Sequence, residues 1–578
     1  MRKSFLLSVF CLTQIFLLPG IQDSAVQASG QMARRIPADS YFYLTMPDIK
    51  NLVEQWKKRS VLQMLDEPAF ADFNQKLKTN YEKASREIEQ KTGYSLATIW
   101  DVPSGEVSIS AFNTSDDHIG SVALMEYGAG ESSVVLKKLL GLAADEMTNG
   151  GASRSIKSVR GTIFRIYSFE ETRQTPDSSP FARKVAYFLK DNTLVISNDD
   201  KLLESILTNW EGRKGDSLAD NKEFQYIFNK CAQKDAAAST HWYLNPVGTI
   251  QSTLDIYKKS EPMAGMAQGV LPSLGISNLK AVGGSAYFFT RDYEFISKTF
   301  TYVKLPGYGL IEIFRCPAVA QQPPWWVSNQ CSSYYSFNWA IDDAYQAVES
   351  LHDGFRVNPG ALAQAIDDYS KQEDSPKIHL KKDILDNLTG RIQIIATQQG
   401  EEIAEQLLGR YTVAVGLKNP EAFQKIMHAL LEWNDSKIAT REFQGTTLYE
   451  YPEGLIPAAF CITDNTLIAS TNVKALEKII RNDRQTDSLV DDPNYKKISQ
   501  IFPTKTSIIS YQRLDTSILA ITQLFQKNKD SVDIDEDILS QFQDLEGVIK
   551  YLPITAGYTV PDDHGFFSVR VTMKKTAE

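Results

Sequence analysis

Two short acidic turns place carboxylates beside an imidazole. Asp116-Asp117-His118 and Asp562-Asp563-His564 each hold two aspartates directly before a histidine. Such a group could take part in acid–base catalysis or in metal binding, because carboxylate oxygens and imidazole nitrogens serve both purposes. Both turns lie between segments with strand-like alternation, however, and polar residues are typical of hairpin tips. The sequence therefore predicts hairpin tips at both places.

A third acidic segment has the alternation that calcium-binding loops use. Asp533-Ile534-Asp535-Glu536-Asp537 offers carboxylates at alternate positions, and Asp544 stands at the twelfth position of the same frame. Calcium prefers oxygen ligands in this pattern, but Ile538 occupies the position where the loop needs glycine for its sharp turn. We expect an acidic, solvated loop before a helix. Calcium binding by Asp533 to Asp544 is the alternative hypothesis.

The rest of the chain holds no recognised catalytic or cofactor motif. It has no His-Glu-x-x-His or Cys-x-x-Cys spacing, no Gly-x-Ser-x-Gly elbow, no phosphate loop and no dinucleotide glycine fingerprint. We therefore predict no catalytic, cofactor-binding or metal-binding residues, no cofactor, and a protein that is not an enzyme. The histidines are scattered and form no metal-binding pair at helical spacing: His118, His241, His352, His379, His428 and His564.

Four cysteines follow the N-terminal segment. Cys316 and Cys331 bracket a short stretch that a disulfide could close in an oxidising compartment, for about 3 kcal/mol of stabilisation. The sequence leaves this bond open, because it does not show whether the two Cα atoms come close enough. Cys461 lies in an apolar strand and is expected to be a buried thiol, whereas Cys231 carries no signal.

The sequence repeats itself. Residues 191–206 and 464–479 align without a gap and share nine of sixteen residues, where unrelated segments would share roughly one. A second block keeps the same order, since residues 99–111 align with residues 384–396. The two halves are therefore expected to be copies of one architecture.

Strand-to-helix joins recur in both halves. In the first half, residues 43–48 lead into Ile49, Leu52, Val53 and Trp56, which share one helical face. We expect an Asp or Asn at each of these joins to cap the first free N–H groups of its helix. The joins carry Asp48, Asn245, Asp342 and Asp515.

Alternating strands fill the space between the joins. Lys190-Asp191-Asn192 and Thr463-Asp464-Asn465 have the residues that tight hairpin turns require. Hairpins with interspersed helices predict an α+β fold of two tandem, internally duplicated domains, each a mainly antiparallel sheet with amphipathic helices. The expected organisation is a signal peptide at 1–28, a first domain at 29–304, a Pro/Gly-containing connector at 305–333 and a second domain at 334–578.

The connector holds an unusual pair of tryptophans, Trp325 and Trp326. Exposed paired tryptophans could dock a partner or lie at a membrane surface. We favour the alternative that they pack into a groove between the two halves, because a linker between duplicated domains needs an anchor.

The N-terminus indicates export. Arg2 and Lys3 precede an apolar run at 5–18, and Val26-Gln27-Ala28 offers a small-residue cleavage site, which together are typical of a secretory signal. No later stretch has the length of a membrane span. Removing residues 1–28 changes the net charge from −10 to −11, and such an acidic chain is a poor partner for nucleic acid. The mature protein is expected in the periplasm or otherwise outside the cytoplasm.

Two further segments, together with the repeat and the signal, indicate a resemblance to a known family. They are the opening Arg35-Ile36-Pro37-Ala38-Asp39-Ser40 and the mid-chain residues 304–311. The chain resembles a family of uncharacterised secreted bacterial proteins that carry a domain of unknown function. Members begin the mature region with a Pro-Ala-Asp phrase, then a strand and an amphipathic helix. The second-half opening, Ser332-Ser333-Tyr334-Tyr335, departs from that phrase. The resemblance implies no catalytic residues.

Duplication without a reaction centre favours a non-catalytic binding or scaffold protein of the bacterial cell envelope, whose partner is an unknown envelope protein. The second hypothesis is a periplasmic carrier of an apolar or lipid-like small molecule, with a pocket in place of a packed core. An enzyme whose site is assembled from distant residues is the third.

Overall fold

The structure is a computed structural model that describes residues 30–114, 118–169, 183–210, 216–258, 261–397, 410–433, 438–451, 458–481, 487–516 and 546–574. The chain divides into two compact units. Unit 1 comprises residues 1–59, 73–270 and 279–303, and unit 2 comprises residues 60–72, 271–278 and 304–578. Within the described residues, no helix is both long and apolar enough to cross a membrane. The segments 1–28 and 533–544 lie outside the described residues.

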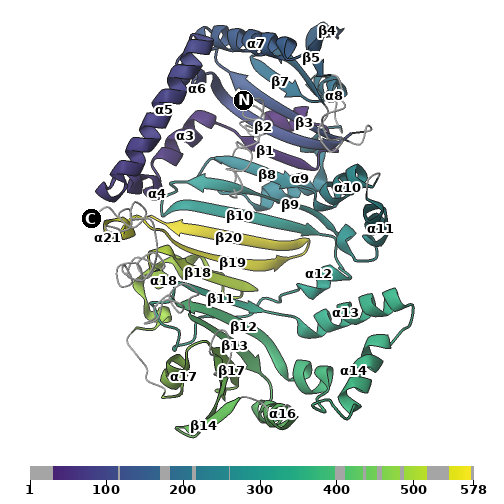
Figure 1. The fold of residues 1–578 in the computed structure, drawn as a ribbon, viewed down its shortest axis with the longest axis vertical. Coiled ribbons are helices and arrows are strands. Elements are labelled where there is room, and N and C mark those ends of the chain that lie inside the picture. The colour runs from purple at the N-terminus through teal and green to yellow at the C-terminus, as the bar shows by residue number, and fades with distance from the viewer. Residues whose placement is uncertain are drawn as a thin grey trace. The chain divides into compact units, whose positions relative to one another are not determined.

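Unit 1 is built on one antiparallel sheet, whose strands lie side by side in the order β4-β5-β6-β7-β3-β2-β1-β8-β9-β10 (Figure 1). Its strands are β1 (Phe42–Met46), β2 (Pro103–Asn113), β3 (Ile119–Tyr127), β4 (Ala152–Val159), β5 (Thr162–Phe169), β6 (Lys184–Lys190), β7 (Thr193–Ser197), β8 (Thr240–Leu244), β9 (Leu279–Phe288) and β10 (Tyr293–Val303).

Helices join some of these strands, whereas others, such as β6 and β7, follow each other directly. The helices of unit 1 are α2 (Gly30–Arg35), α3 (Ile49–Lys57), α5 (Ala71–Thr92, which begins in unit 2), α6 (Leu96–Trp100), α7 (Glu131–Asn149), α8 (Asp200–Trp210), the 3₁₀ turn η3 (Leu218–Asp220), α9 (Lys222–Lys230), α10 (Pro246–Tyr257) and α11 (Pro262–Val270).

Unit 2 also has one antiparallel order, β14-β15-β16-β17-β13-β12-β11-β18-β19-β20. Its strands are β11 (Ser333–Asn338), β12 (Leu388–Thr397), β13 (Arg410–Leu417), β14 (Ala439–Phe443), β15 (Thr446–Tyr451), β16 (Ala458–Thr463), β17 (Thr466–Ser470), β18 (Ile508–Arg513), β19 (Ile554–Asp562) and β20 (Gly565–Met573).

The helical segments of unit 2 include three short turns that precede α5 in the chain. The full set is α4 (Ser60–Gln63), η1 (Met64–Asp66), η2 (Pro68–Phe70), η4 (Ile276–Asn278), α12 (Leu310–Ile313), α13 (Ile341–Arg356), α14 (Ala361–Lys371), the π-helical η5 (Leu380–Ile384), η6 (Leu385–Asn387), α16 (Pro420–Trp433), α17 (Val473–Ile480), η7 (Leu489–Asp491), α18 (Pro493–Ile498), η8 (Ser499–Ile501) and α21 (Glu546–Ile549).

The strand order of unit 2 is that of unit 1 with ten added to each strand number. The registers correspond as well. Phe42 faces Ala111 across β1 and β2, and Ser333 faces Ala396 across β11 and β12. Each unit therefore combines a large antiparallel sheet with helices, which confirms the mixed helix-and-strand class.

The two predicted hairpin turns are confirmed. β6 and β7 are joined at Asp191-Asn192, and β16 and β17 are joined at Asp464-Asn465. All four residues have positive φ, between 46° and 57°. Two successive positive φ values define the tight turn whose twist matches that of antiparallel strands, and Asp and Asn tolerate this conformation.

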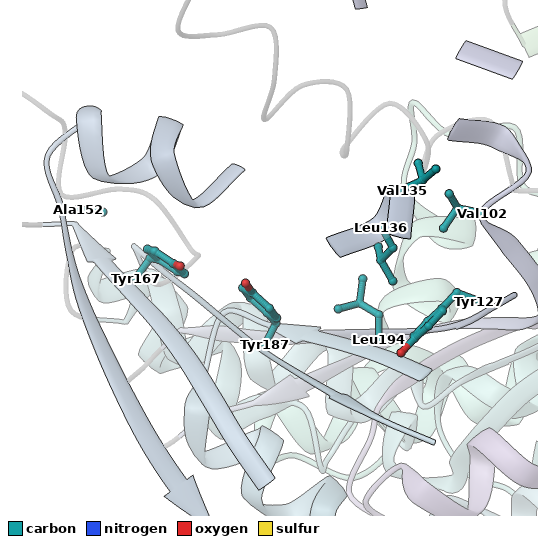
Figure 2. Close-up of a cluster of buried hydrophobic side chains, with 8 residues drawn as sticks. All are labelled: Val102, Tyr127, Val135, Leu136, Ala152, Tyr167, Tyr187 and Leu194. Carbon is teal, nitrogen blue, oxygen red and sulfur yellow. The ribbon is translucent and has the colours of Figure 1, made fainter. Parts of the chain in front are cut away.

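Part of the core of unit 1 lies between α7 and the sheet. Figure 2 shows Leu136 of α7 directed toward Leu194 of β7 and Tyr127 of β3, all of them buried. The rings of Tyr167 and Tyr187 stack alongside, with centroids 6.4 Å apart. These contacts remove apolar area from water, which is the main favourable term in folding.

The segment predicted as a connector, residues 305–333, belongs to unit 2. Trp326 packs against buried side chains of that unit, among them Ala414, Leu448 and Cys461. Trp325 and Trp326 are both half-buried. The connector is therefore tied to the sheet of unit 2 by apolar contact.

Capping follows the prediction at two joins and not at the others. The side chains of Asp48 and Asn245 accept hydrogen bonds from the N–H groups of Asn51 and Gly248, which confirms both caps. The prediction for Asp342 is wrong, because α13 begins two residues earlier than predicted, at Ile341, and Asp342 forms an ion pair with Lys381 instead.

Asp515 does not fulfil the predicted cap either. Its carboxylate forms an ion pair with Arg513, with 2.9 Å between Oδ2 and Nη2. Residues 514–516 are already helical, so this helix begins before Asp515.

Asp48→Ala is expected to lower the free energy of unfolding of unit 1 by about 1 kcal/mol, because it removes the acceptor of the N–H group of Asn51. Urea unfolding followed by tryptophan fluorescence measures the change. Asp101→Ala removes an equally charged side chain whose contact with Lys50 is exposed and 3.9 Å long, so it should change stability by less than about 0.5 kcal/mol. Equal effects of the two variants would contradict the cap.

Candidate functional site

A cavity of about 220 Å³ lies in unit 2. It is formed where the connector passes over β12, β13 and the turn that leads into β17. Its lining supplies two indoles, a guanidinium, an amide, a carboxylate and a hydroxyl, from Pro324, Trp325, Trp326, Arg391, Gln393, Gly416, Asp464 and Thr466. Polar groups around an indole wall make this the candidate binding site of the described residues.

The connector is held over the sheet by backbone hydrogen bonds. The N–H of Leu489 donates to the carbonyl of Val327 at 2.7 Å, and Ser328 forms an isolated bridge with Ser488. These contacts fix the residues that precede them, which are Trp325 and Trp326. The two indoles are therefore positioned by main-chain pairing as well as by apolar packing.

Arg391 stands on β12 and points its guanidinium at the connector. Its Nη2 donates to the carbonyl of Gln322 at 2.7 Å. Its Nε is buried and has no hydrogen-bond partner among the residues that the structure describes. A buried donor that lacks a partner costs about 1–3 kcal/mol, so this guanidinium has unused capacity to bind an acceptor.

Gln393 lies two residues further along β12, on the same face of the sheet. Its side chain is 4% exposed, and its Nε2 donates to the hydroxyl of Tyr334 at 2.8 Å. Burial raises the pKa of Tyr334 above its ordinary value, so that phenol stays protonated. The Gln393 amide is therefore held in one orientation at the wall of the cavity.

The equal strand orders identify the corresponding place in unit 1. Glu106 of β2 aligns with Arg391 of β12, because residues 99–111 align with residues 384–396. Val107 faces Met125 as Ile392 faces Val415, so Glu126 corresponds to Gly416. Glutamates in unit 1 therefore correspond to an arginine and a glycine in unit 2.

The connector has a counterpart as well. Pro37 bridges Ser217 as Ser328 bridges Ser488. Arg35 lies two residues before Pro37, and Trp326 lies two residues before Ser328, so Arg35 corresponds to Trp326. The hairpin turns align Asp191 with Asp464, and Thr193 with Thr466.

In unit 1 this place is filled by side chains of the protein. The Nη1 of Arg35 lies 3.3 Å from the hydroxyl of Thr193, and its guanidinium lies 3.6 Å from the centre of the Trp210 ring. Burial lowers the pKa of Arg35, whereas the charges of Glu126, Glu106 and Asp191 raise it. Arg35 is thus a cation enclosed by an indole and acidic side chains.

Glu106 is the most deeply buried acid of this group, with 4% of its surface exposed. Its Oε1 accepts a hydrogen bond from Thr45 at 2.7 Å, and its Oε2 accepts one from the N–H of Met32 at 3.4 Å. Burial raises the pKa of Glu106 to about 7, although these hydrogen bonds oppose the shift. Glu126 adds a like charge that raises the pKa further.

The candidate turns of the sequence behave as hairpin tips. Asp563 and His564 turn between β19 and β20, and the N–H of His564 donates to Asp562 at 3.2 Å. His118 follows β2 and precedes β3, and its carbonyl accepts a hydrogen bond from the hydroxyl of Thr114. Asp116 and Asp117 lie outside the described residues, as does the calcium-like segment from Asp533 to Asp544.

The histidines and cysteines form no common site in the part of the chain that the structure describes. No group of three or more His, Cys, Asp or Glu is arranged to hold a metal ion there. Cys231, Cys316, Cys331 and Cys461 are free thiols, so Cys316 and Cys331 are not bonded to each other. Cys461 is buried, as predicted, and burial raises its pKa to about 12.

Residues 358–555, which lie in unit 2, match the family described as "Protein of unknown function (DUF3352)". The match includes Arg391, Gln393, Gly416, Asp464 and Thr466 of the cavity lining. It begins after Trp325 and Trp326, so it does not include them. Comparison with curated proteins and with solved structures gives no match. The chain is therefore similar, over residues 358–555, to an uncharacterised domain family.

Proposed function

We propose that this chain is a non-catalytic binding or scaffold protein of the bacterial cell envelope. The cavity of unit 2 is the observation that supports it most directly. Its lining groups suit recognition, since they offer one cation, one anion, hydrogen-bonding groups and two indoles. In the described part of the chain the buried Nε of Arg391 has no partner, and a bound acceptor would satisfy it.

The proposal includes export and duplication. Segment 1–28 acts as a cleaved signal, so the mature protein begins at Ser29 and resides outside the cytoplasm. The two units arose as copies of one ancestral unit, which their equal strand orders and the nine shared residues between 191–206 and 464–479 support. One copy then became closed by Arg35 while the other retained a cavity.

The carrier hypothesis receives less support. Binding sites for drug-sized apolar molecules enclose roughly 300–1,000 Å³ and are lined mainly by apolar side chains. The cavity of unit 2 is about 220 Å³ and is lined by Arg391 and Asp464 among others. A lipid-like ligand would leave both charges without a partner.

Native mass spectrometry of the mature protein, purified from its own cell envelope, tests the proposal. We expect a mass that starts at Ser29 and carries an additional protein or small molecule, which is lost under denaturing conditions. A full-length mass that starts at Met1, recovered in the cytoplasmic fraction, would contradict export. A bare chain in every preparation, with no partner after crosslinking in cells, would contradict binding.

A further inference from the structure

Two opposite charges line the cavity of unit 2 without pairing with each other. Arg391 and Asp464 both contribute to its wall. Within the described residues neither side chain forms an ion pair, and the hydrogen-bond partners of the Arg391 guanidinium there are neutral, the carbonyl of Gln322 and the hydroxyl of Tyr334. A guanidinium and a carboxylate held apart in one small cavity are complementary to a ligand that carries the two opposite charges.

Unit 1 shows what the same place holds when it is occupied. The Arg35 guanidinium fills it and reaches the hydroxyl of Thr193, whose counterpart Thr466 lines the cavity of unit 2. In unit 2, Trp326 replaces Arg35 and Gly416 replaces Glu126, so both charged side chains are missing. Two specific replacements therefore accompany the open space in unit 2.

The charge on the sheet is also reversed. Unit 1 presents Glu106 to the bound guanidinium, whereas unit 2 presents Arg391 from the corresponding position. The turn keeps its acid in both units, as Asp191 and Asp464. Unit 1 thus offers three acids to a cation, Glu106, Glu126 and Asp191, whereas unit 2 offers one cation and one acid.

We propose that the cavity of unit 2 binds a compact zwitterion of the amino-acid class, with the carboxylate on Arg391 and the ammonium on Asp464. This inference rests on the proposed binding function and specifies its ligand. A volume of about 220 Å³ equals that of roughly seven water molecules, which is room for an amino acid and too little for a drug-sized molecule. Trp325 and Trp326 supply the wall for the ligand's side chain, and Thr466 supplies a hydroxyl.

Calorimetric titration of the full mature chain tests this assignment. The probes are alanine, leucine and phenylalanine, together with two analogues of phenylalanine that each lack one charge. 3-Phenylpropanoate lacks the ammonium and phenethylamine lacks the carboxylate. We expect at least one of the amino acids to bind, and we expect each analogue to bind about tenfold or more weakly than phenylalanine, because each leaves one charge of the cavity unpaired.

Two substitutions assign the charges. Arg391→Gln should weaken amino-acid binding about tenfold or more and abolish the preference for phenylalanine over phenethylamine. Asp464→Asn should abolish the preference for phenylalanine over 3-phenylpropanoate. Lys496→Gln and Asp563→Asn remove equal charges at exposed positions and should leave binding unchanged.

Gly416→Glu tests whether the open space beside Arg391 is needed for binding. A Cβ on residue 416 would lie 3.6 Å from the Cβ of Arg391 and would displace only the side chain of Thr389, so the new carboxylate would lie beside the guanidinium. We expect this variant to fold, as judged by circular dichroism, and to bind no amino acid. Trp325→Ala, which leaves the backbone unchanged, should weaken the binding of phenylalanine more than the binding of alanine.

Absence of binding by all three amino acids would overturn the inference, as would retention of full affinity in both Arg391→Gln and Gly416→Glu. The proposed function fails separately. If native mass spectrometry finds another partner or ligand while the amino acids do not bind, only the inference falls. If neither experiment finds a bound species, both fall.

Discussion

Arg59→Met is expected to lower the free energy of unfolding of unit 1 by about 3–5 kcal/mol. The Nε of Arg59 lies 3.3 Å from Oε1 of Glu294, and the Glu294 side chain is 4% exposed. Removing the guanidinium takes a cation away from a buried carboxylate. The desolvation of that carboxylate is then compensated less, and this costs more than the loss of the attraction itself.

Aromatic rings enclose this ion pair and strengthen the expectation. The guanidinium of Arg59 lies 5.1 Å from the ring of Trp56, 5.5 Å from that of Phe295 and 5.7 Å from that of Phe288. The rings exclude water, which raises the strength of the charge interaction, and their faces attract the cation.

Urea unfolding measures the effect, with two variants as references. Lys50→Met breaks the exposed pair with Asp101, whose side chains are 50% and 78% exposed, and should change stability by about 0.5 kcal/mol at most. Arg59→Met combined with Glu294→Met should recover part of the loss, because the buried carboxylate that lost the guanidinium is also removed. A single Arg59→Met variant as stable as the wild type would show that the pair contributes nothing.

The repeated turns could be predicted from sequence because their chemistry is local. Asp191-Asn192 and Asp464-Asn465 combine two residue types that accept positive φ, and alternating strands flank them. The Asp48 cap was predictable for the same reason. Asp342 shows the limit of such reasoning, since the residue type is right but Lys381, distant in sequence, competes for its carboxylate.

The candidate site could be predicted only in part. The alignment of residues 99–111 with 384–396 already places Glu106 and Arg391 at one position, so the reversal of charge was visible as a signal. Gly416 could not be placed beside Arg391, because the register between β12 and β13 shifts between Leu388 and Ile392. One residue of shift moves a side chain to the other face of a sheet.

Trp325 and Trp326 show the same limit. Two adjacent indoles in a linker suggested an anchor. The surface on which they pack, however, depends on the main-chain bonds that Val327 and Ser328 make with residues 488 and 489. Those bonds join segments about 160 residues apart in sequence. Long-range pairing of this kind leaves no local pattern, so the cavity and its unit 1 counterpart emerge only in the folded chain.

Glu106→Gln is expected to change how the stability of unit 1 depends on pH. The folded pKa of Glu106, about 7, lies above its ordinary value of 4.5, so the folded state binds this proton more tightly than the unfolded state. The stabilisation is complete below about pH 4.5, is lost as the pH rises to about 7, and stays lost above that value. The free energy of unfolding of the wild type therefore falls by on the order of 3 kcal/mol between these two pH values.

Glutamine cannot ionise, so the variant should lack this loss and should be more stable than the wild type at pH 8 by on the order of 2–3 kcal/mol. Its amide can replace the protonated acid, since its oxygen can accept from the N–H of Met32 and its nitrogen can donate to Thr45, whose hydroxyl already lies 3.3 Å from the carbonyl of Val107. The two forms should be equally stable near pH 4.

The measurement is urea unfolding of both proteins at pH 4, 6 and 8. Glu146→Gln, at an exposed position of α7, serves as the control and should follow the wild type at each pH. Arg35 from α2, Glu126 from β3 and Tyr43 from β1 face Glu106 and are unchanged in every variant, so a difference at pH 8 that vanishes at pH 4 belongs to Glu106 itself. A constant difference at all three values would show that folding does not shift the pKa of Glu106, which would contradict the prediction.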